Sequence, residues 1–243
     1  MNVLATACNS AYFNACLTLI ASIHRLSFND VDKILVYNLG LTEDEKEQLN
    51  SLQKVQVMEF NLDDSYFQEY LTPKQFAWKP YVIKDAGNYG NLILYMDSGA
   101  VTVKNIKCLY DIIENDDILI VGDYHPNYVY THDKCFEIMN ATEEEKQYLQ
   151  IWAGMQGYKV NGKYQSSYVD EAFKFSKLKD AVFGNHTNHR HDQSIYSILC
   201  CRNRVPRQDI YIYGEWRGIN MNPNQIIYAH RRAYSNLEGL MYK

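Results

Sequence analysis

The chain of 243 residues is 47% hydrophobic, which is enough to bury the core of one large α/β domain or of two small ones. Its net charge of −5 excludes a general affinity for nucleic acid or anionic membranes, so an anionic ligand must be met by locally placed lysines and arginines. The six cysteines form no C-x-x-C pair, which favours reduced core thiols over disulfides or a zinc site.

The apolar stretch 3–23 is interrupted by Asn9, Ser10 and Asn14 and follows no basic segment. It therefore predicts a strand followed by a helix, not a signal peptide or a membrane span. From this pattern we expect a cytoplasmic protein with no transmembrane segment.

Strands and helices are predicted to alternate through the first hundred residues. Strands are expected at 3–7, 33–38 and 55–60, and helices after the caps Asn9 and Ser10, from the capping box at Thr42 to about residue 52, and over 74–88. Pro80 must lie in the first turn of the third helix or bend it. This alternation predicts a mostly parallel sheet with right-handed crossovers, flanked by helices.

A buried strand over 92–96 ends at Asp97, which Ser98 and Gly99 follow. Its unbroken apolar run is typical of a parallel strand that is covered on both faces. Because ligands of open α/β sheets bind beyond the carboxyl ends of the strands, Asp97 is a candidate for a metal or a hydroxyl group. The alternative is that Asp97 only caps the next element or closes a turn.

The second half gives weaker patterns. We expect a single domain over 1–243, because no repeat, low-complexity tract or linker interrupts the chain. The expected elements are strands at 101–103, 117–122, 210–213 and 225–229, helices at 106–114, 167–179 and from 192, a loop or edge strand at 124–131, a solvated acidic helix opened by a capping box at 142–145, a glycine turn at 152–157 and a polar loop at 184–190.

Polar residues interrupt this apolar framework at five places. They are Asn9 with Tyr12, the Trp78-Lys79-Pro80 segment, the Asp97-Ser98-Gly99 strand end, the Asp192-Gln193 pair, and His230 with Arg231 and Arg232. In a parallel sheet the first and fourth strands end at the same edge, so the sequence predicts that Asn9 and Asp97 face one cleft.

Four segments, in order, resemble the nucleotide-sugar glycosyltransferases of the GT-A fold: Leu4-Ala-Thr6 through Tyr12, the helix with Lys79, the strand Leu94-Tyr-Met-Asp97, and the pair Asp192-Gln193. The resemblance covers roughly residues 2–232 and implies a Rossmann-like nucleotide-binding part over about 1–105 and an acceptor and donor-sugar part over about 106–232. It implies that the donor is a UDP- or GDP-linked sugar. The residues implied in donor binding are Ala5, Thr6, Asn9, Tyr12, Lys79, Asp97, Ser98 and Arg231.

The resemblance also implies catalytic roles. Asp192 would bind hydroxyls of the donor sugar, Gln193 would lie near its anomeric carbon, and Lys79 would contact the donor. Each has a structural alternative: Asp192 could simply cap its helix, and Lys79 could lie on the surface. Tyr124, His125, Tyr128 and Tyr130 are expected on the acceptor side from their loop position.

Gly99 stands where the family's Asp-x-Asp metal motif has its second aspartate. A Mn²⁺ or Mg²⁺ ion would then have only Asp97 and His230 as protein ligands, completed by phosphate oxygens and water. Lys79, Arg190, Arg231 and Arg232 could instead neutralise the departing diphosphate without a metal. The cluster His186, His189 and His191 has no spacing typical of a closed zinc site and is read as a polar loop.

The sequence therefore predicts a glycosyltransferase that moves a hexose from a nucleoside diphosphate sugar to a hydroxyl of a glycan, lipid or protein acceptor. The resemblance of Asp192-Gln193 to the pair of retaining members favours retention of the anomeric configuration, and inversion stays open because a carboxylate base such as Asp192 could equally serve it. The alternative is a non-catalytic nucleotide-sugar or glycan-binding protein of the same fold, for which Gly99 is the best evidence. A nucleotidyltransferase is disfavoured, because no glycine-rich basic loop follows the first strand. The sequence indicates neither the sugar nor the oligomeric state.

Overall fold

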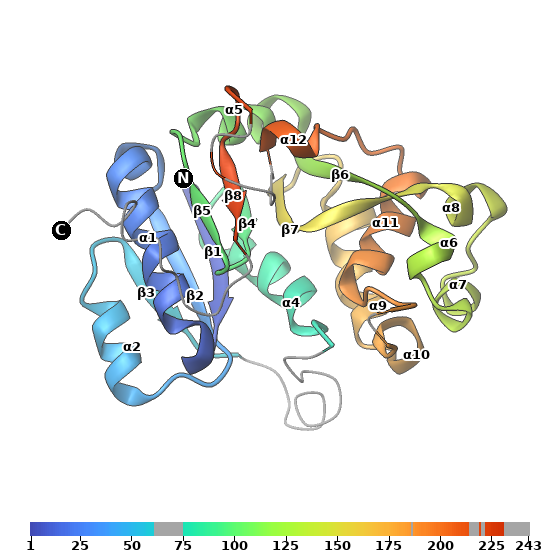
Figure 1. The fold of residues 1–243 in the computed structure, drawn as a ribbon, viewed down its shortest axis with the longest axis horizontal. Coiled ribbons are helices and arrows are strands. Elements are labelled where there is room, and N and C mark those ends of the chain that lie inside the picture. Colours follow the sequence, from blue (N-terminus) through green and yellow to red (C-terminus); the bar gives the residue numbers. More distant parts are fainter. Residues whose placement is uncertain (61–74, 186, 214–218, 220–221, 231–243) are drawn as a thin grey trace.

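A twisted sheet forms the centre of the molecule. Its strands are β1 (Asn2–Cys8), β2 (Lys33–Asn38), β3 (Val55–Met58), β4 (Leu92–Met96), β6 (Ile118–Pro126) and β7 (Leu149–Lys159). The computed structural model describes residues 1–60, 75–185, 187–213, 219 and 222–230, and in these the strand order is β3-β2-β1-β4-β7-β6 (Figure 1). The strands from β3 to β4 run parallel, whereas β7 is antiparallel to both β4 and β6. The predicted mostly parallel α/β sheet is confirmed.

Two apolar layers cover the sheet because its strands alternate between its faces. In β1, Val3, Ala5 and Ala7 belong to one core cluster, and Leu4 and Cys8 belong to the other. Burial on both faces explains why these strands appear in the sequence as unbroken apolar runs.

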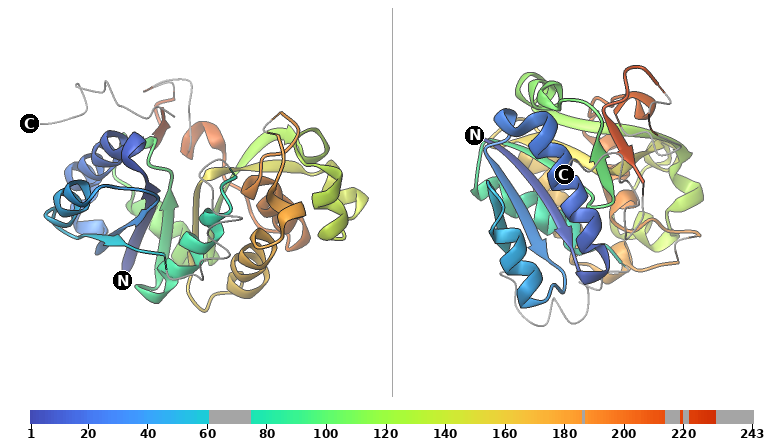
Figure 2. Two further views of the ribbon diagram at one scale, coloured as in Figure 1. Left: turned by 90° about the horizontal axis from the view of Figure 1, so that it is seen from below. Right: turned by 60° about the vertical axis from the view of Figure 1, so that its left-hand side comes forward.

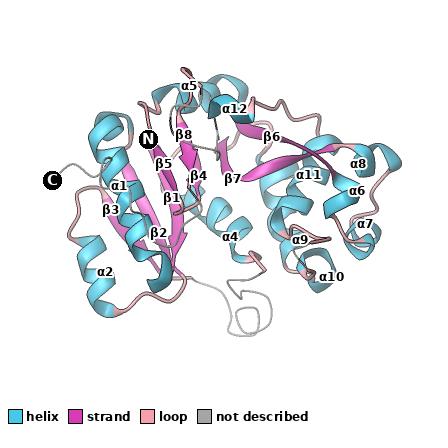
Figure 3. Cartoon of the chain, viewed as in Figure 1, coloured by secondary structure: helices cyan, strands magenta, loops and turns pink. Residues whose placement is uncertain are grey.

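Helices lie on both faces of the sheet (Figures 2 and 3). One layer contains α1 (Phe13–Ser27), α2 (Glu43–Asn50), α5 (Lys107–Asp116) and α12 (Ile210–Tyr213). The other contains α4 (Trp78–Asp85), α7 (Asp133–Ile138), α9 (Glu171–Ser176), α10 (Lys179–Val182) and α11 (Asp192–Arg202). The short helices α6 (Asn127–Tyr130) and α8 (Glu143–Gln147) follow the far end of β6, and the strands β5 (Ala100–Thr102) and β8 (Ile227–Ala229) pair antiparallel in a small second sheet.

The helix caps that the sequence predicts near the N-terminus are confirmed. Asn9 caps the short 3₁₀ turn Ser10–Tyr12 by accepting a hydrogen bond from the backbone of Tyr12, and Thr42 forms the predicted capping box with Glu45. Pro80 lies in the first turn of α4, where a missing backbone donor is tolerated. Residue 74 of the predicted helix lies outside the described residues.

Three predictions for the second half were wrong or incomplete. The glycine turn at 152–157 lies inside β7, where glycine is required by packing, because a Cβ on Gly154 would lie 2.7 Å from the ring of Trp152. Residues 210–213 form helix α12 instead of a strand. The segment 124–131 is divided between the end of edge strand β6 and helix α6.

The second capping box, between Thr142 and Glu145, is present, but its glutamate is not solvated. The carboxylate of Glu145 is buried and accepts hydrogen bonds from Arg202, from Nε at 2.7 Å and from a second guanidinium nitrogen at 3.0 Å. This two-point pair joins α8 to α11, so the predicted solvated face is wrong at that residue.

All six cysteines are free thiols, as predicted, and five of them are buried. No helix in the described ranges has both the length and the apolar character that a bilayer crossing requires.

Candidate active site

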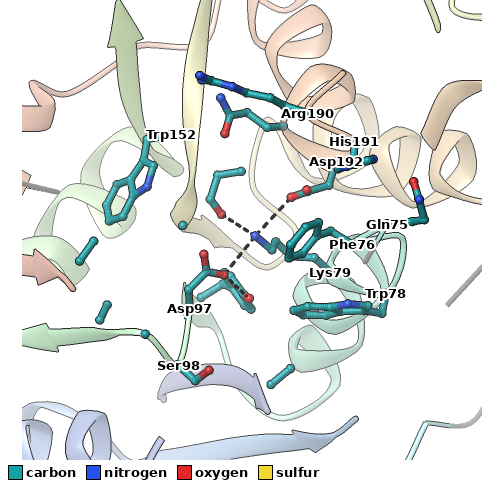
Figure 4. A pocket seen from close by; sticks show the side chains of 18 of the residues that line it. Gln75, Phe76, Trp78, Lys79, Asp97, Ser98, Trp152, Arg190, His191 and Asp192 are labelled. Carbon is teal, nitrogen blue, oxygen red and sulfur yellow. Dashed lines mark hydrogen bonds and ion pairs between the residues drawn. The ribbon is translucent and has the colours of Figure 1, made fainter. Parts of the chain in front are cut away.

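A cavity of about 1040 Å³ opens at the carboxyl ends of β1 and β4 and continues toward the N-terminus of α11 (Figure 4). It confirms the expected placement of Asn9 and Asp97 in one cleft. The structure brings together seven of the predicted residues in its wall: Asn9, Tyr12, Lys79, Asp97, Ser98, Asp192 and Gln193. Ala5 and Thr6 are fully buried in β1 and do not line the cavity, so their placement gives no support to the predicted direct contact with a nucleotide.

Lys79 forms the centre of the site. Its ammonium group lies 3.0 Å from Oδ1 of Asp97 and 3.4 Å from Oδ2 of Asp192, and it donates to the carbonyl of Ala153 at 3.3 Å (Figure 4). Three oxygen atoms thus surround the ammonium group, two as ion-pair partners and one, the Ala153 carbonyl, as a hydrogen-bond acceptor. Lys79 is 4% exposed, so the structural alternative of a surface lysine is excluded.

Three distant elements place these charges. Lys79 lies in the first turn of α4, Asp97 follows β4, and Asp192 is the first residue of α11. The hydroxyl of Tyr95 donates to Oδ1 of Asp97 at 2.7 Å, and its ring lies 5.4 Å from the Lys79 ammonium. The ring of Tyr95 and the three nearby oxygen atoms together hold Lys79 in one position.

Burial acts in opposite directions on the charged partners. Burial raises the pKa of Asp192 to about 6, Lys79 opposes this shift, and the nearby Asp97 carboxylate adds to it. Burial alone would lower the pKa of Lys79, but the carboxylates of Asp192 and Asp97 outweigh it, so the net shift is upward. One cation shared by two carboxylates therefore stays charged, while the more buried carboxylate is close to protonation.

Two residues with strained backbones lie beside this cluster. Phe76 has φ 54° and His191 has φ 56°, a region that non-glycine residues seldom adopt, and their rings are 5.8 Å apart. Nδ1 of His191 lies 2.8 Å from the carbonyl of Val182 and must donate to it. Burial lowers the pKa of His191, which keeps this imidazole neutral. Such strain gathers at functional sites and here sets the direction in which α11 presents Asp192.

A second polar cluster forms the wall built by β6, β7 and the loop before α11. The guanidinium of Arg190 lies 3.0 Å from Oδ2 of Asp123 and 3.3 Å from Oε1 of Gln150, and the same oxygen accepts from the amide of Gln193 at 2.8 Å. His125 lies 2.7 Å from the other oxygen of Asp123. Apart from Gln193, the only residues of this cluster named in the sequence analysis are His125, expected on the acceptor side, and Arg190, expected to neutralise the diphosphate.

The predicted metal ligands are only partly placed. The side chain of Asp97 is 44% exposed. In the small sheet Ala100 of β5 pairs with Ala229 of β8, so His230, which follows β8, comes next to the loop that contains Asp97. No group of three or more histidine, cysteine or acidic side chains suited to a metal occurs among the described residues. The protein part of the site alone does not form a complete metal shell. Arg231, Arg232 and His186 lie outside the described residues.

Comparisons with known proteins found neither a matching family model nor a curated protein of similar sequence. Solved structures do match. The galactosyltransferase LgtC, solved with donor and acceptor sugar analogues, has a TM-score of 0.60 at 13% identity, with 88% of this chain and 75% of that chain covered. Mouse xyloside xylosyltransferase 1 has a TM-score of 0.55 at 14% identity, with 88% and 87% covered. For the bifunctional glycosyltransferase WbbM the TM-score is 0.56 at 15% identity, with 86% of this chain and only 39% of WbbM covered.

These proteins share their fold with this chain but little of its sequence. The chain has the GT-A fold of glycosyltransferases, a single α/β domain whose sheet combines parallel strands with an antiparallel β7. The predicted fold is thereby confirmed. The division of roles near residue 105 stays a prediction.

Proposed function

We propose that this protein is a glycosyltransferase that moves a hexose from a UDP- or GDP-linked sugar to the hydroxyl of an acceptor. The observation that carries the proposal is the buried Lys79, which holds Asp97 and Asp192 together in a cavity at the carboxyl ends of a GT-A sheet. Burying the Lys79 ammonium and the Asp192 carboxylate is costly, and perturbed charged groups of this kind cluster at functional sites.

The lining residues divide into nucleotide, diphosphate and sugar sides. Asn9 and Tyr12 follow β1 and are proposed to contact the nucleoside, with Tyr12 39% exposed and available for stacking. Asp97 and Ser98 are proposed to lie at the diphosphate. Asp192 is proposed to accept hydrogen bonds from hydroxyls of the donor sugar, with Gln193 at its anomeric carbon.

Lys79 is proposed as a positioning residue as much as a donor contact. Its ammonium group already lies between two carboxylates and the Ala153 carbonyl, so a direct contact with a donor phosphate would require it to move away from one of them. Its position fixes the separation of the two carboxylates, and the donor would bind in the space that they line.

The charge balance around Lys79 bears on how a diphosphate is held. One ammonium and two ionised carboxylates leave a net negative charge, which by itself repels an anionic leaving group. A Mn²⁺ or Mg²⁺ ion bound by Asp97 and His230, with phosphate oxygens completing its shell, would neutralise the diphosphate as it leaves. Arg190 and Arg231 are the protein cations proposed for the same purpose.

A non-catalytic nucleotide-sugar or glycan-binding protein is the second candidate, and Gly99 favours it, because the side chain that would supply a second carboxylate is missing. Both candidates predict donor binding, and they differ in turnover.

The test is release of nucleoside diphosphate from a panel of UDP- and GDP-hexoses, with and without Mn²⁺, together with calorimetry of binding. We expect turnover of at least one donor and its loss in Asp192→Asn, whereas Asp111→Asn, which alters an exposed carboxylate on α5, should behave as the parent. Donor binding without turnover would favour the binding protein, and neither binding nor turnover would refute both. The anomeric proton of the product would decide between retention and inversion.

A further inference from the structure

His125 and Asp123 form an ordered pair in the lining of the same cavity as Lys79. Both residues line the cavity from β6, and Nδ1 of His125 lies 2.7 Å from Oδ1 of Asp123. Asp123 is 7% exposed, whereas the side chain of His125 is 43% exposed. A buried carboxylate therefore holds a histidine that remains accessible from the cavity.

The surroundings of Asp123 fix the histidine tautomer. The carboxylate of Asp123 also receives the backbone N–H of Tyr124 at 2.6 Å and the guanidinium of Arg190 at 3.0 Å. A carboxylate that accepts these donors must also accept from the imidazole, so the Nδ1 atom of His125 carries the proton. In the neutral ring this leaves the lone pair on Nε2, available to a ligand.

Aromatic contacts keep the imidazole ring in place. The ring of Tyr130 meets the imidazole edge-on, with 5.1 Å between the ring centroids. The guanidinium of Arg190 lies 3.8 Å from the centroid of the Tyr130 ring. The titratable and charged groups around His125 are thus Asp123 and Tyr124 on β6, Tyr130 on α6 and Arg190 in the loop before α11.

The carboxylates of the cavity are less suited to take up a proton from an acceptor. Asp97 and Asp192 are both paired with the Lys79 ammonium, and Asp192 is 3% exposed. His191 is 2% exposed and uses Nδ1 on a backbone carbonyl. His125 combines an orienting carboxylate with exposure to the cavity.

We propose that His125 is the general base that activates the acceptor, with Asp123 as its positioning residue, and this role rests on the proposed transfer reaction. Nε2 takes the proton of the acceptor hydroxyl while the acceptor oxygen bonds to the anomeric carbon. The bond between that carbon and the phosphate oxygen breaks, and the nucleoside diphosphate leaves with the electron pair. The imidazolium is stabilised by Asp123 and then loses its proton to solvent.

The decisive variant is His125→Gln, which keeps a polar side chain of similar reach but cannot take up a proton. Turnover is followed as nucleoside diphosphate release from the sugar nucleotide that the parent uses, with p-nitrophenyl glycosides as acceptors and water where none of them is used. Loss of a general base predicts that kcat falls by about 100-fold or more, with the dissociation constant of the nucleoside diphosphate unchanged by calorimetry. The matched control His24→Gln changes a histidine of α1 that does not line the cavity and whose Nε2 lies 2.9 Å from the carbonyl of Gln53, and it should match the parent.

The pH profile separates a base from a structural role. The ratio of the parent kcat to the His125→Gln kcat should rise from acidic to neutral pH, since only the parent has this base, whereas protonation of Asp192 affects both proteins alike. Asp123→Asn should lower kcat less and change the tautomer seen in ¹⁵N spectra of His125. A parent-like kcat in His125→Gln would overturn the role of His125 alone, and a parent that neither binds nor turns over any sugar nucleotide would overturn the proposed function and this role together.

Discussion

The cavity has two polar walls, one around Lys79 and one around Asp123, and they are built differently. Around Lys79, one buried cation is shared by two carboxylates, the buried Asp192 and the 44% exposed Asp97, and each partner comes from a different element of the fold. Around Asp123, one carboxylate is shared by a cation and an imidazole that stays 43% exposed at its side chain. The first arrangement positions an exposed carboxylate through a buried cation, whereas the second positions an exposed imidazole through a buried carboxylate. We propose that the donor binds at the first wall and the acceptor at the second.

The largest effect is expected on removal of the cation from the first wall. Lys79→Met leaves Asp192 buried without a cation, and breaking a buried pair in this way costs about 3–5 kcal/mol in the free energy of unfolding. Urea denaturation measures it. In the control Lys84→Met, the pair with Asp170 at 2.9 Å is partly exposed, and the loss should be about 0–1 kcal/mol. Equal losses in the two variants would contradict the assigned burial.

The protonation of Asp192 gives the next effect. Its folded pKa of about 6 lies above the ordinary value of 3.8, so the folded state binds the extra proton. The resulting stabilisation is complete below the ordinary value and is lost as the pH rises through about 6, and a shift of this size corresponds to about 3 kcal/mol. Urea unfolding between pH 4.5 and 7.5 should show the parent losing stability relative to Asp192→Asn. Parallel curves for the two proteins would show that the carboxyl is not shifted upward.

A smaller effect is expected in the second wall. Arg190→Met removes a hydrogen-bonded charge from Asp123 and the stacking on Tyr130, for a loss of about 2 kcal/mol. Arg190→Lys keeps the charge but not the planar stacking, and should recover about half of this loss. Thermal or urea unfolding of the three proteins checks the order. If the loss in Arg190→Met exceeded that in Lys79→Met, the contrast between the two walls would be reversed.

The smallest expected change adds a carboxylate to the first wall. The backbone of Gly99 has no positive φ, so a side chain there is tolerated, and Gly99→Asp restores the Asp-x-Asp pattern. We expect Mn²⁺ to bind about 10-fold more tightly by calorimetry, because metal affinity rises with the number of charged ligands. Gly99→Asn, which adds the same shape without the charge, is the control, and equal affinities for the two variants would show that residue 99 does not face the metal position.

The first wall could be predicted in large part from the sequence, because its residues interrupt strong local patterns. Asp97 ends an unbroken apolar strand, Asp192 opens a periodic helix, and Trp78 and Pro80 flank Lys79. The sequence did not reveal that Lys79 holds both carboxylates, because that contact depends on how α4 and α11 are packed.

The second wall could not be predicted as a cluster. Asp123, Gln150 and Arg190 are far apart in the sequence and meet only because β7 runs antiparallel between β4 and β6. That strand was obscured by Gly154 and Gly157, which were read as turn residues although they make room for Trp152 and Ile113. Packing against a neighbouring side chain, unlike capping or periodicity, leaves no pattern within one segment.

The placement of the donor between these walls is tested most directly by a crystal structure with UDP or GDP and Mn²⁺. We predict that the nucleoside lies at Asn9 and Tyr12 and the diphosphate at Asp97, with space for the sugar between Asp192 and Gln193 and for an acceptor toward His125. A nucleotide bound outside this cavity, or with its diphosphate directed away from Asp97, would contradict the donor assignment.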